Sequence, residues 1–505
     1  MPKPMGFDNE KYLLEQTAAI RERVTRFKDK LYLEFGGKLL FDFHAARVLP
    51  GFDPNVKMRL LQEMGDQAEV ILCIYAGDIE RKKVRADFGI TYDADALKLI
   101  DDLEDWGIPV RAVVITRYEE QPAAASFKAR LEHQGMEVHT HRYTRGYPTE
   151  VDVVVSKEGY GANSYVTTEK PIVVVTGPGP GSGKLATCLS QLYHDYRGGL
   201  DSGYAKFETF PIWNLPLEHP VNVAYEAATA ELRDVNRLDH FHLEAFDQRA
   251  VNYNRDLEAF PLLTRIVEKI TGHRAFYASP TDMGVNRAGF GIVDDPVVRE
   301  AGKQEIVRRY FRYACEHNMG LVDQETVQRI EILMDNLGLE PESRPVVAPA
   351  HDAAEEAVRK GKGNNGIFCG AAMELPDGAI VTGSNSPLMH AASSLILNAA
   401  KRLTGTPREQ DLLPPAVTGS LGNLKKNVLA RRRVSLDAEE TLIALAIAST
   451  SEPSAKAALP ALREMRGCEV HMTHMPSPGD EAGLRKLGVN LTTEPRFASR
   501  RLYGS

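Results

Sequence analysis

The spacing of hydrophobic residues predicts alternating strands and helices over the first third of the chain. Short apolar runs, such as Ile172 to Val175, are typical of buried parallel strands. Between the runs, apolar residues recur every three or four positions, as in amphipathic helices. The expected strands are 39–43, 70–75, 110–116, 138–143, 151–155 and 172–176, with helices at 93–105 and 123–133 and a first helix capped by Asp8. This alternation predicts an α/β fold with a mostly parallel open sheet, in which ligands bind beyond the carboxyl ends of the strands.

Beyond residue 176 the pattern becomes mainly helical, and after a linker it is α/β again. Helices are expected at 222–233, 239–251 and 257–271, and the linker at 340–349 is rich in proline and charge. Later strands are expected at 367–374, 379–382, 468–474 and 489–492, and helices at 351–360, 388–403, 441–448, 455–465 and 480–487. We therefore expect three regions: 1–215, an α/β domain with a glycine-rich loop; 216–340, mainly helical; and 345–505, a smaller C-terminal α/β domain.

Composition narrows the class of protein. A chain of 505 residues is too long for a single core, and a net charge of −8 argues against binding nucleic acid through a basic surface. The five cysteines are scattered and odd in number, which favours reduced thiols in a cytoplasmic protein, and no CxxC motif indicates a zinc site. Residues 378–400 are uncharged but contain polar residues, so we interpret them as a hairpin strand and a buried helix and expect no membrane contact. We also expect a homo-oligomer.

One segment combines a strand, a glycine-rich loop and a helix, and it is the strongest candidate for a ligand site. Four glycines fall within residues 177–183 and are followed directly by Lys184. Glycine amides can converge on an anion because no Cβ keeps it away, and the first amides of a helix lie at the positive end of its dipole. The segment therefore predicts a cradle for the phosphate of a phosphorylated small molecule. The expected phosphate-binding residues are Gly177, Gly179, Gly181, Ser182, Gly183, Lys184 and Thr187.

The loop departs at two positions from the nucleotide-binding P-loop, G-x-x-x-x-G-K-[ST]. Pro178 stands where the first glycine is expected, so the loop is one residue longer when counted from Gly177. Leu185 stands where a hydroxyl would bind magnesium, and Thr187 lies on another side of the helix. A standard site would take ATP or another nucleotide with Mg²⁺. The alternatives are a phosphate site of another kind and a glycine-rich turn without a ligand.

Other polar groups are weaker candidates, each with a simpler structural explanation. Asp78 follows an apolar run, as a magnesium-binding acid or a turn residue would, and the basic residues after it could reach phosphates or form a solvated face. The clusters 252–256 and 279–287 could hold a polar substrate or make turns and caps. The expected catalytic residues are Lys184, for charge on a transferring phosphate, and Arg255 and Asp282, for substrate contact and acid–base work.

Several longer segments carry a resemblance to a known family. They are Thr-Gly-Pro-Gly-Pro-Gly-Ser-Gly-Lys (176–184), Thr-Cys-Leu-Ser-Gln-Leu-Tyr (187–193), Val-Asn-Tyr-Asn-Arg-Asp (251–256), Ser-Pro-Thr-Asp-Met-Gly-Val-Asn (279–286) and Lys-Leu-Gly-Val-Asn-Leu-Thr (486–492). In these segments the chain resembles an uncharacterised bacterial family, the domain-of-unknown-function family 1846. The resemblance covers nearly the whole chain, but it implies no activity because none is established for the family.

Histidines in the last third raise the question of a metal. Residues 370–385 resemble the opening hairpin of cytidine-deaminase-like domains, in which a zinc ligand and a catalytic glutamate follow. Here those positions are His390 and Ala392, and no Pro-Cys-x-x-Cys follows, so such a domain would be catalytically silent as a deaminase. His471 and His474 are three residues apart on an expected strand and therefore face opposite sides. We expect no metal site from these residues.

Two hypotheses of function follow. The first is an enzyme that binds a phosphorylated small molecule and transfers a phosphoryl group or hydrolyses a nucleotide. The second is a non-enzymatic nucleotide-binding regulator or scaffold with a catalytically silent deaminase-like domain, which the missing hydroxyl residue after Lys184 favours. Measuring phosphate release with and without magnesium distinguishes the two.

Overall fold

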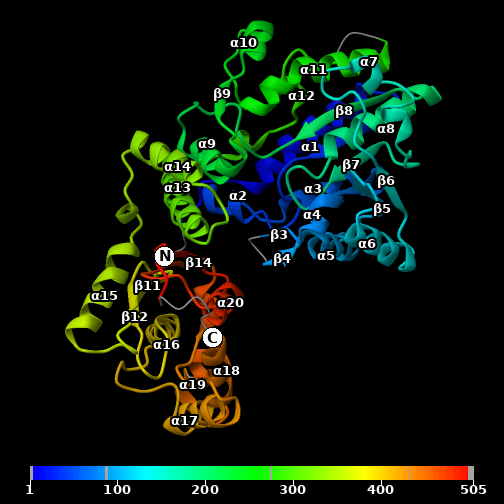
Figure 1. Ribbon diagram of the computed structural model, residues 1–505. Coiled ribbons are helices and arrows are strands. Elements are labelled where there is room, and N and C mark those ends of the chain that lie inside the picture. The colour runs from blue at the N-terminus through cyan, green and yellow to red at the C-terminus, as the bar shows by residue number, and fades with distance from the viewer. Residues whose placement is uncertain (1–3, 86–88, 273–275, 432, 499–505) are drawn as a thin grey trace. The chain divides into compact units, whose positions relative to one another are not determined.

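The chain folds into two compact units (Figure 1). The computed structural model describes residues 4–85, 89–272, 276–431 and 433–498. The N-terminal unit comprises Pro4–Glu226 and Asp234–Gly302, and the C-terminal unit comprises Ala227–Arg233 and Lys303–Ser505. Helices α9 (Pro220–Ala228) and α13 (Asp295–Asn318) each cross the division along the chain.

A six-stranded parallel sheet lies at the centre of the N-terminal unit, as the sequence predicts. Its strands are β1 (Lys30–Phe35), β2 (Ala68–Tyr75), β5 (Val110–Thr116), β6 (Val138–His141), β7 (Ile172–Thr176) and β8 (Ser202–Phe207). Their order across the sheet is β6-β5-β2-β7-β1-β8. Because β7 lies between β2 and β1, the glycine-rich loop leaves from the middle of the carboxyl edge of the sheet.

Helices cover both faces of this sheet. Val173 and Val175 of β7 pack with apolar side chains of α8 and α11, while the alternating residue Val174 is equally buried on the other face. The helices of the unit are α1 (Asn9–Thr25), α2 (Phe43–Val48), α3 (Val56–Met64), α4 (Ala76–Glu80), α5 (Tyr92–Asp105), α6 (Pro122–His133), α7 (Val151–Val154), α8 (Lys184–Gly198), α10 (His240–Phe246), α11 (Asn254–Thr271) and α12 (Pro280–Met283). Asp8 caps α1, as expected, by accepting hydrogen bonds from the amides of Glu10 and Lys11.

Two small antiparallel ladders complete the N-terminal unit. One pairs β3 (Val84–Arg85) with β4 (Ile90–Thr91), and the other pairs β9 (Asn236–Leu238) with β10 (Val251–Tyr253). The second ladder corrects the predicted helix at 239–251. The helix α10 ends because Asp247 takes a left-handed conformation (φ 52°), after which the chain turns back to pair as β10.

Two predicted strands of the first third are also wrong. Residues 39–43 do not form a strand, because Asp42 caps α2 through the amide of Ala45 and is held by the Lys57 ammonium at 2.8 Å. Residues 151–154 form the single helical turn α7, whose Val154 packs into the core beside α8. Within the six-stranded sheet, the strands that the sequence pattern did not predict are β1 and β8, in which charged residues interrupt the apolar pattern.

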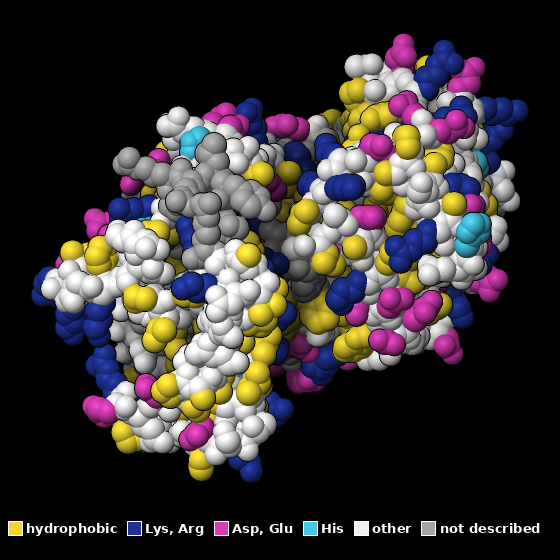
Figure 2. Space-filling view, turned by 60° about the horizontal axis from the view of Figure 1, so that its bottom comes forward, with side chains coloured by type: hydrophobic (Ala, Val, Ile, Leu, Met, Phe, Trp, Pro, Cys, Tyr) yellow, Lys and Arg dark blue, Asp and Glu magenta, His cyan; other side chains and the backbone are white. Residues whose placement is uncertain are grey.

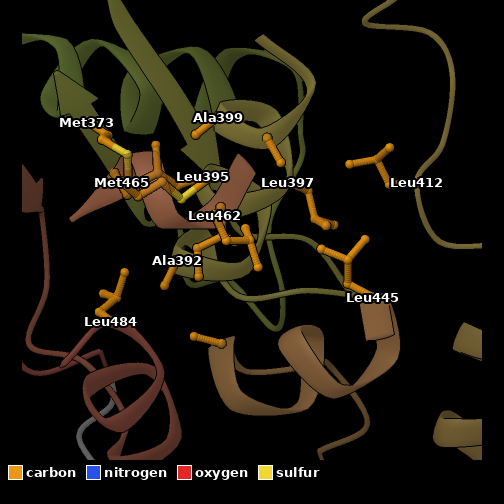
Figure 3. Close-up of a cluster of buried hydrophobic side chains, with 14 of the residues drawn as sticks. Met373, Ala392, Leu395, Leu397, Ala399, Leu412, Leu445, Leu462, Met465 and Leu484 are labelled. Carbon is orange, nitrogen blue, oxygen red and sulfur yellow. The ribbon is translucent and has the colours of Figure 1, made fainter. Parts of the chain in front are cut away.

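The C-terminal unit is built on a four-stranded mixed sheet with the order β12-β11-β13-β14. Its strands are β11 (Gly370–Glu374), β12 (Ile380–Ser384), β13 (Glu469–Met472) and β14 (Asn490–Thr493), and only β13 and β14 are parallel. Its helices are α14 (Gln324–Asn336), α15 (Val347–Arg359), α16 (Ala391–Thr404), α17 (Pro415–Asn423), α18 (Ala438–Ala448), α19 (Pro453–Ala461) and α20 (Pro478–Leu487). Figure 3 shows its core, in which Leu395 of α16 lies near Leu462, Met465 and Met373.

Residues 378–400 supply β12 and α16, as predicted. Among the described residues, none of the helices combines the length and the apolar character needed to cross a bilayer. On the face drawn in Figure 2, basic and acidic side chains are interspersed with hydrophobic ones.

Candidate functional site

The glycine-rich loop connects β7 to α8 and has no room for side chains at its start. A Cβ at Gly177 would lie 2.3 Å from the carbonyl oxygen of Cys73 on β2. Gly183 is the N-cap of α8 and has a φ of 93°, a left-handed conformation that favours glycine. A Cβ at this position would also lie 2.7 Å from the Thr116 side chain on β5, so the backbone conformation and the lack of space both require glycine. The loop is therefore fixed closely against β2 and β5.

Two carbonyl oxygens of the loop accept hydrogen bonds from residues at the carboxyl end of β5. The Thr116 hydroxyl donates to the Ser182 oxygen at 2.8 Å, and the Arg117 guanidinium donates to the Gly181 oxygen. Within the described parts of the chain, no hydrogen bond engages the backbone N–H groups of residues 181–183, and no side chain caps α8. The loop therefore presents donors without acceptors at the positive end of a helix of 15 residues.

Two hydroxyl groups beside the loop are buried without a partner. Among the described residues, neither Thr176 Oγ1 nor Ser182 Oγ has a hydrogen bond, although only 1% of each residue is exposed. Buried polar groups are nearly always hydrogen-bonded in folded proteins. These two hydroxyls are therefore available to a bound ligand, as far as the described residues go.

Lys184 and Thr187 occupy different surroundings on α8. The Lys184 ammonium is 3.5 Å from the Gly179 carbonyl oxygen, so it lies back over the loop. Thr187 is fully buried, and its hydroxyl accepts from Cys73 Sγ at 3.4 Å. Burial raises the pKa of the Cys73 thiol to about 12, so this group stays protonated. In this arrangement Thr187 faces the sheet, and Lys184 is the residue of the helix start that lies over the loop.

A pocket of about 370 Å³ adjoins the start of the loop. Thr176, Gly177 and Pro178 line one side, and residues 37–41 after β1 line another. Lys98 and Asp102 of α5, which form an ion pair, contribute charges of both signs. Asp78 does not line this pocket; it is buried in α4 and pairs with Arg81, which agrees with a structural role for it.

A second pocket of about 360 Å³ lies at the carboxyl end of β8. It brings together the two polar clusters that the sequence indicated, because Asn252 and Asp256 line it from one and Thr281 and Asn286 from the other. The remaining lining residues are Lys206, Glu208, Phe210, Pro211, Trp213, Val251, Pro280 and Gly284. Sequence reasoning missed Lys206 and Glu208, although two charges two residues apart at the end of an apolar alternation could have indicated a strand facing a polar site.

One cation in this pocket serves two carboxylates. Lys206 Nζ lies 2.6 Å from Asp256 Oδ2 and 3.1 Å from Glu208 Oε1, and it donates to the Tyr253 hydroxyl. Burial raises the pKa of Glu208, and the negative charge of Asp256 raises it further. Together they outweigh the lowering by the Lys206 ammonium, so the pKa of Glu208 is about 7. Although burial opposes the charge on Lys206, its carboxylate neighbours raise its pKa. Glu208 can therefore take up or release a proton near neutral pH, as general acid–base catalysis requires.

Arg255 and Asp282 lie beside this pocket in sequence but do not line it. The Arg255 guanidinium forms a bidentate ion pair with the buried Asp234, with distances of 2.6 and 2.9 Å. The Asp282 carboxylate accepts from the Ala278 amide at 3.1 Å, and the backbone carbonyl oxygen of Asp282 accepts from the Arg23 guanidinium. Both residues hold local structure around the lining residues, and their predicted contact with a substrate stays a prediction.

The strand β1 lies between the strands that carry the two pockets, since β7 and β8 are its two neighbours in the sheet. Glu34 of β1 pairs with Val175 of β7 and with Lys206 of β8. Two residues further along each strand, the same register places Gly36 beside Gly177 and Glu208. A Cβ on Gly36 would lie 2.3 Å from Glu208 Cγ, so the Glu208 side chain lies directly over that glycine. Neighbouring strands are about 4.8 Å apart, which places Gly177 and Glu208 about 10 Å from each other.

These features define the class of protein: an α/β protein whose parallel sheet carries a glycine-rich strand–loop–helix and a cluster of one lysine and two carboxylates at its carboxyl edge. The chain belongs to the DUF1846 family. Family models described as domain of unknown function DUF1846 match residues 5–338 for the N-terminal part and 342–503 for the C-terminal part. This confirms the resemblance drawn from the sequence motifs.

Full-length relatives support the same assignment. The chain is 54% identical over 500 residues to a UPF0371 protein of Clostridium botulinum (strain Langeland), covering 99% of both chains. It is 54% identical over 502 residues to a UPF0371 protein of Fusobacterium nucleatum and 52% identical over 499 residues to one of Clostridium tetani, again covering 99% of each chain. These names state no activity.

Proposed function

We propose that this protein is an enzyme that binds the phosphate of a phosphorylated small molecule at residues 177–184 and acts on that molecule in the pocket at the end of β8. The observation that carries the proposal is the group of donors without acceptors at the start of α8. Among the described residues, the amides of residues 181–183 and the Ser182 hydroxyl are donors without acceptors. The Lys184 ammonium, which donates to the Gly179 oxygen at 3.5 Å, adds a positive charge beside them, and an oxyanion can accept from all three kinds of donor.

The spacing of the two pockets supports a single ligand that reaches both. A distance of about 10 Å between Gly177 and Glu208 matches the length of a sugar phosphate or a nucleotide better than that of inorganic phosphate. Lys206 would neutralise charge on the bound molecule, and Glu208, with a pKa of about 7, would transfer a proton to or from it. ATP or another nucleotide with Mg²⁺ remains one proposed ligand, with phosphoryl transfer or hydrolysis as the reaction.

A second candidate is a nucleotide-binding regulator or scaffold without turnover. Two observations favour it: Leu185 follows Lys184 in place of a hydroxyl residue, and the Thr187 hydroxyl is directed at Cys73 and away from the loop. In this candidate the C-terminal unit is a silent deaminase-like domain, with Ala392 at the start of α16 where the resemblance would require glutamate. Binding without phosphate release, with or without Mg²⁺, would favour this second candidate.

Titration calorimetry with inorganic phosphate, ATP and a hexose phosphate tests the phosphate site. Lys184→Ala should weaken binding of the ligand that binds wild type by at least tenfold, because a charge-assisted contact of about 1.5 kcal/mol or more is lost. Arg197→Ala is the matched control, since it removes one positive charge from the other end of the same helix, about 20 Å away. Equal affinities of both variants and the wild type would exclude this location of the site.

Two accompanying proposals concern the setting of the protein. We place it in the cytoplasm, because all five of its cysteines are buried thiols outside any disulfide. We also expect a homo-oligomer and no nucleic-acid or membrane partner. Light scattering reads the oligomeric state, and the same phosphate titrations on the oligomer and on a diluted sample report whether the site depends on it.

A further inference from the structure

Three potential metal ligands from distant parts of the sequence meet in the C-terminal unit. They are His351 of α15, His471 of β13 and Glu494, which directly follows β14. One ligand atom from each lies within 4.8 Å of the other two. His351 Nε2 is 3.0 Å and His471 Nε2 is 3.5 Å from Glu494 Oε1. Two ligands bound at about 2.05 Å to a tetrahedral ion are about 3.3 Å apart, so both distances are close to those of a bound set.

The hydrogen bonds of His471 fix which of its nitrogens carries the lone pair. Its Nδ1 lies 2.9 Å from Thr492 Oγ1. That hydroxyl donates its single proton to the Val470 carbonyl oxygen at 3.1 Å, so it accepts from His471. Nδ1 therefore carries the proton in the neutral ring, and the lone pair is on Nε2.

This lone pair has no hydrogen-bond donor in the part of the chain that the structure describes. The His471 side chain is fully buried, and Nε2 has no hydrogen bond among the described residues. It points toward Glu494 Oε1, which is also an acceptor. Two acceptors that face each other repel, and burial shields the His471 nitrogen from water that would relieve that repulsion, so a cation between the two removes it.

We propose that His351, His471 and Glu494 bind one divalent transition-metal ion of the zinc type. Imidazole nitrogens with a carboxylate are a usual ligand set for Zn²⁺ and for neighbouring first-row metals. His351 is exposed and Glu494 is partly exposed, so the ion keeps a coordination position open to water or to a small ligand. Thr492 orients His471 from behind, and the buried Arg344 donates to Thr492 at 2.9 Å, which supplies the outer hydrogen bonds that metal sites use.

The proposed site differs from the pair His471 and His474, which are close in sequence. The His474 Nδ1 atom lies 3.0 Å from Thr473 Oγ1, and His474 is not part of the cluster. The expected absence of a metal rested on neighbours along one strand, whereas the ligands proposed here come from a helix, a strand and the segment after another strand. The site is also independent of the phosphate proposal, because its residues all belong to the C-terminal unit.

Metal titration of the full-length protein tests the proposal. After treatment with a chelator and its removal, the protein should bind one equivalent of Zn²⁺ in competition with a chromophoric chelator, and Co²⁺ should give the visible absorption of a low-coordinate site. His351→Gln and Glu494→Gln should each weaken Zn²⁺ binding by about 100-fold, because each removes one of three ligands. His474→Gln is the matched control and should bind as the wild type does.

The outcomes separate a built site from adventitious binding. Failure of the wild type to take up one equivalent, or equal affinities of the wild type and the two ligand variants, would overturn the proposal. His351 is exposed, so His351→Gln should retain the fold, and circular dichroism checks this even if a substitution of the buried His471 does not fold.

Discussion

Lys206 and Glu208 are two residues apart at the end of one strand, and their charged atoms lie 3.1 Å apart. Residues at this spacing share one face of a strand, which is why both line the same pocket. Asp256 also bonds to Lys206, so Glu208 does not have the cation to itself. Burial and the charge of Asp256 raise the pKa of Glu208, and the shared Lys206 lowers it, so the balance leaves this pKa at about 7.

The pKa of Glu208 should appear in the pH dependence of stability. Because burial raises this pKa to about 7, the folded protein retains a proton that the unfolded chain releases near pH 4.5. The Glu208 carboxyl therefore contributes up to about 3 kcal/mol to the free energy of unfolding below pH 4.5, and this contribution is lost as the pH rises to 7. Urea unfolding of wild type and Glu208→Gln across this range should show the slope only in the wild type. Glu258→Gln, at an exposed position of α11, is the control and should behave as the wild type does; a parallel course of all three proteins would contradict the prediction.

Two glycines of the loop should respond differently to substitution by alanine. Gly177→Ala places a Cβ 2.3 Å from the carbonyl oxygen of Cys73, so the loop or β2 must shift, at a cost of about 3 kcal/mol. Gly181→Ala meets open space and costs only about 1 kcal/mol, for its left-handed φ of 75°. Thermal unfolding measures both. A larger loss for Gly181→Ala would show that the loop is packed differently.

Arg344 should be essential for the C-terminal unit. It is fully buried and donates to Glu469 at 2.6 Å, to Thr492 and to the carbonyl oxygens of Val470 and Asn490. Arg344→Met removes all of these bonds and leaves Glu469 with one guanidinium, that of Arg308, and the Asn490 amide, so we expect a loss of about 3–5 kcal/mol. Chemical denaturation followed by circular dichroism measures it. Arg344→Met with Glu469→Gln should recover part of the loss, and no recovery would argue against an electrostatic cause.

The thiols should be inert in the folded protein. All five cysteines are buried thiols outside any disulfide, and burial raises the pKa of Cys73 and of Cys369 to about 12 and that of Cys315 to about 11. The thiolate is the reactive form, so an aromatic disulfide reagent at mildly alkaline pH should modify none of them within minutes. After unfolding in guanidinium the same reagent should modify all five. Rapid modification of the native protein would indicate local opening.

The sequence predicted the elements whose apolar pattern is uninterrupted and missed those in which charge enters it. The parallel sheet, β7 and α8 follow from the run Ile172 to Val175 and the glycines after it. β8 was missed because Lys206 breaks its apolar pattern. The charge of this lysine is stabilised by Asp256 of α11, with which it forms an ion pair in the pocket. Local spacing carries no information about such a partner 50 residues away.

The candidate sites show the same limit. The loop at 177–184 could be found because its chemistry lies in consecutive residues. The cluster of His351, His471 and Glu494 could not, because α15 and the paired strands β13 and β14 are far apart in sequence and only the fold brings them together. Residues 151–155 were wrongly predicted for a related reason: β propensity is satisfied only where a neighbouring strand is available, and Val154 instead packs against the core as part of one helical turn.

The position of β7 between β1 and β2 has a consequence for how the protein is made on the ribosome. β1 and β2 emerge early, but each has an edge that only β7, starting at Ile172, can fill. Until β7 has been synthesised, β1 and β2 each expose an edge whose backbone groups are unpaired. Unpaired strand edges are the kind of surface that chaperones bind. Synthesis that stalls before this point would leave an aggregation-prone fragment.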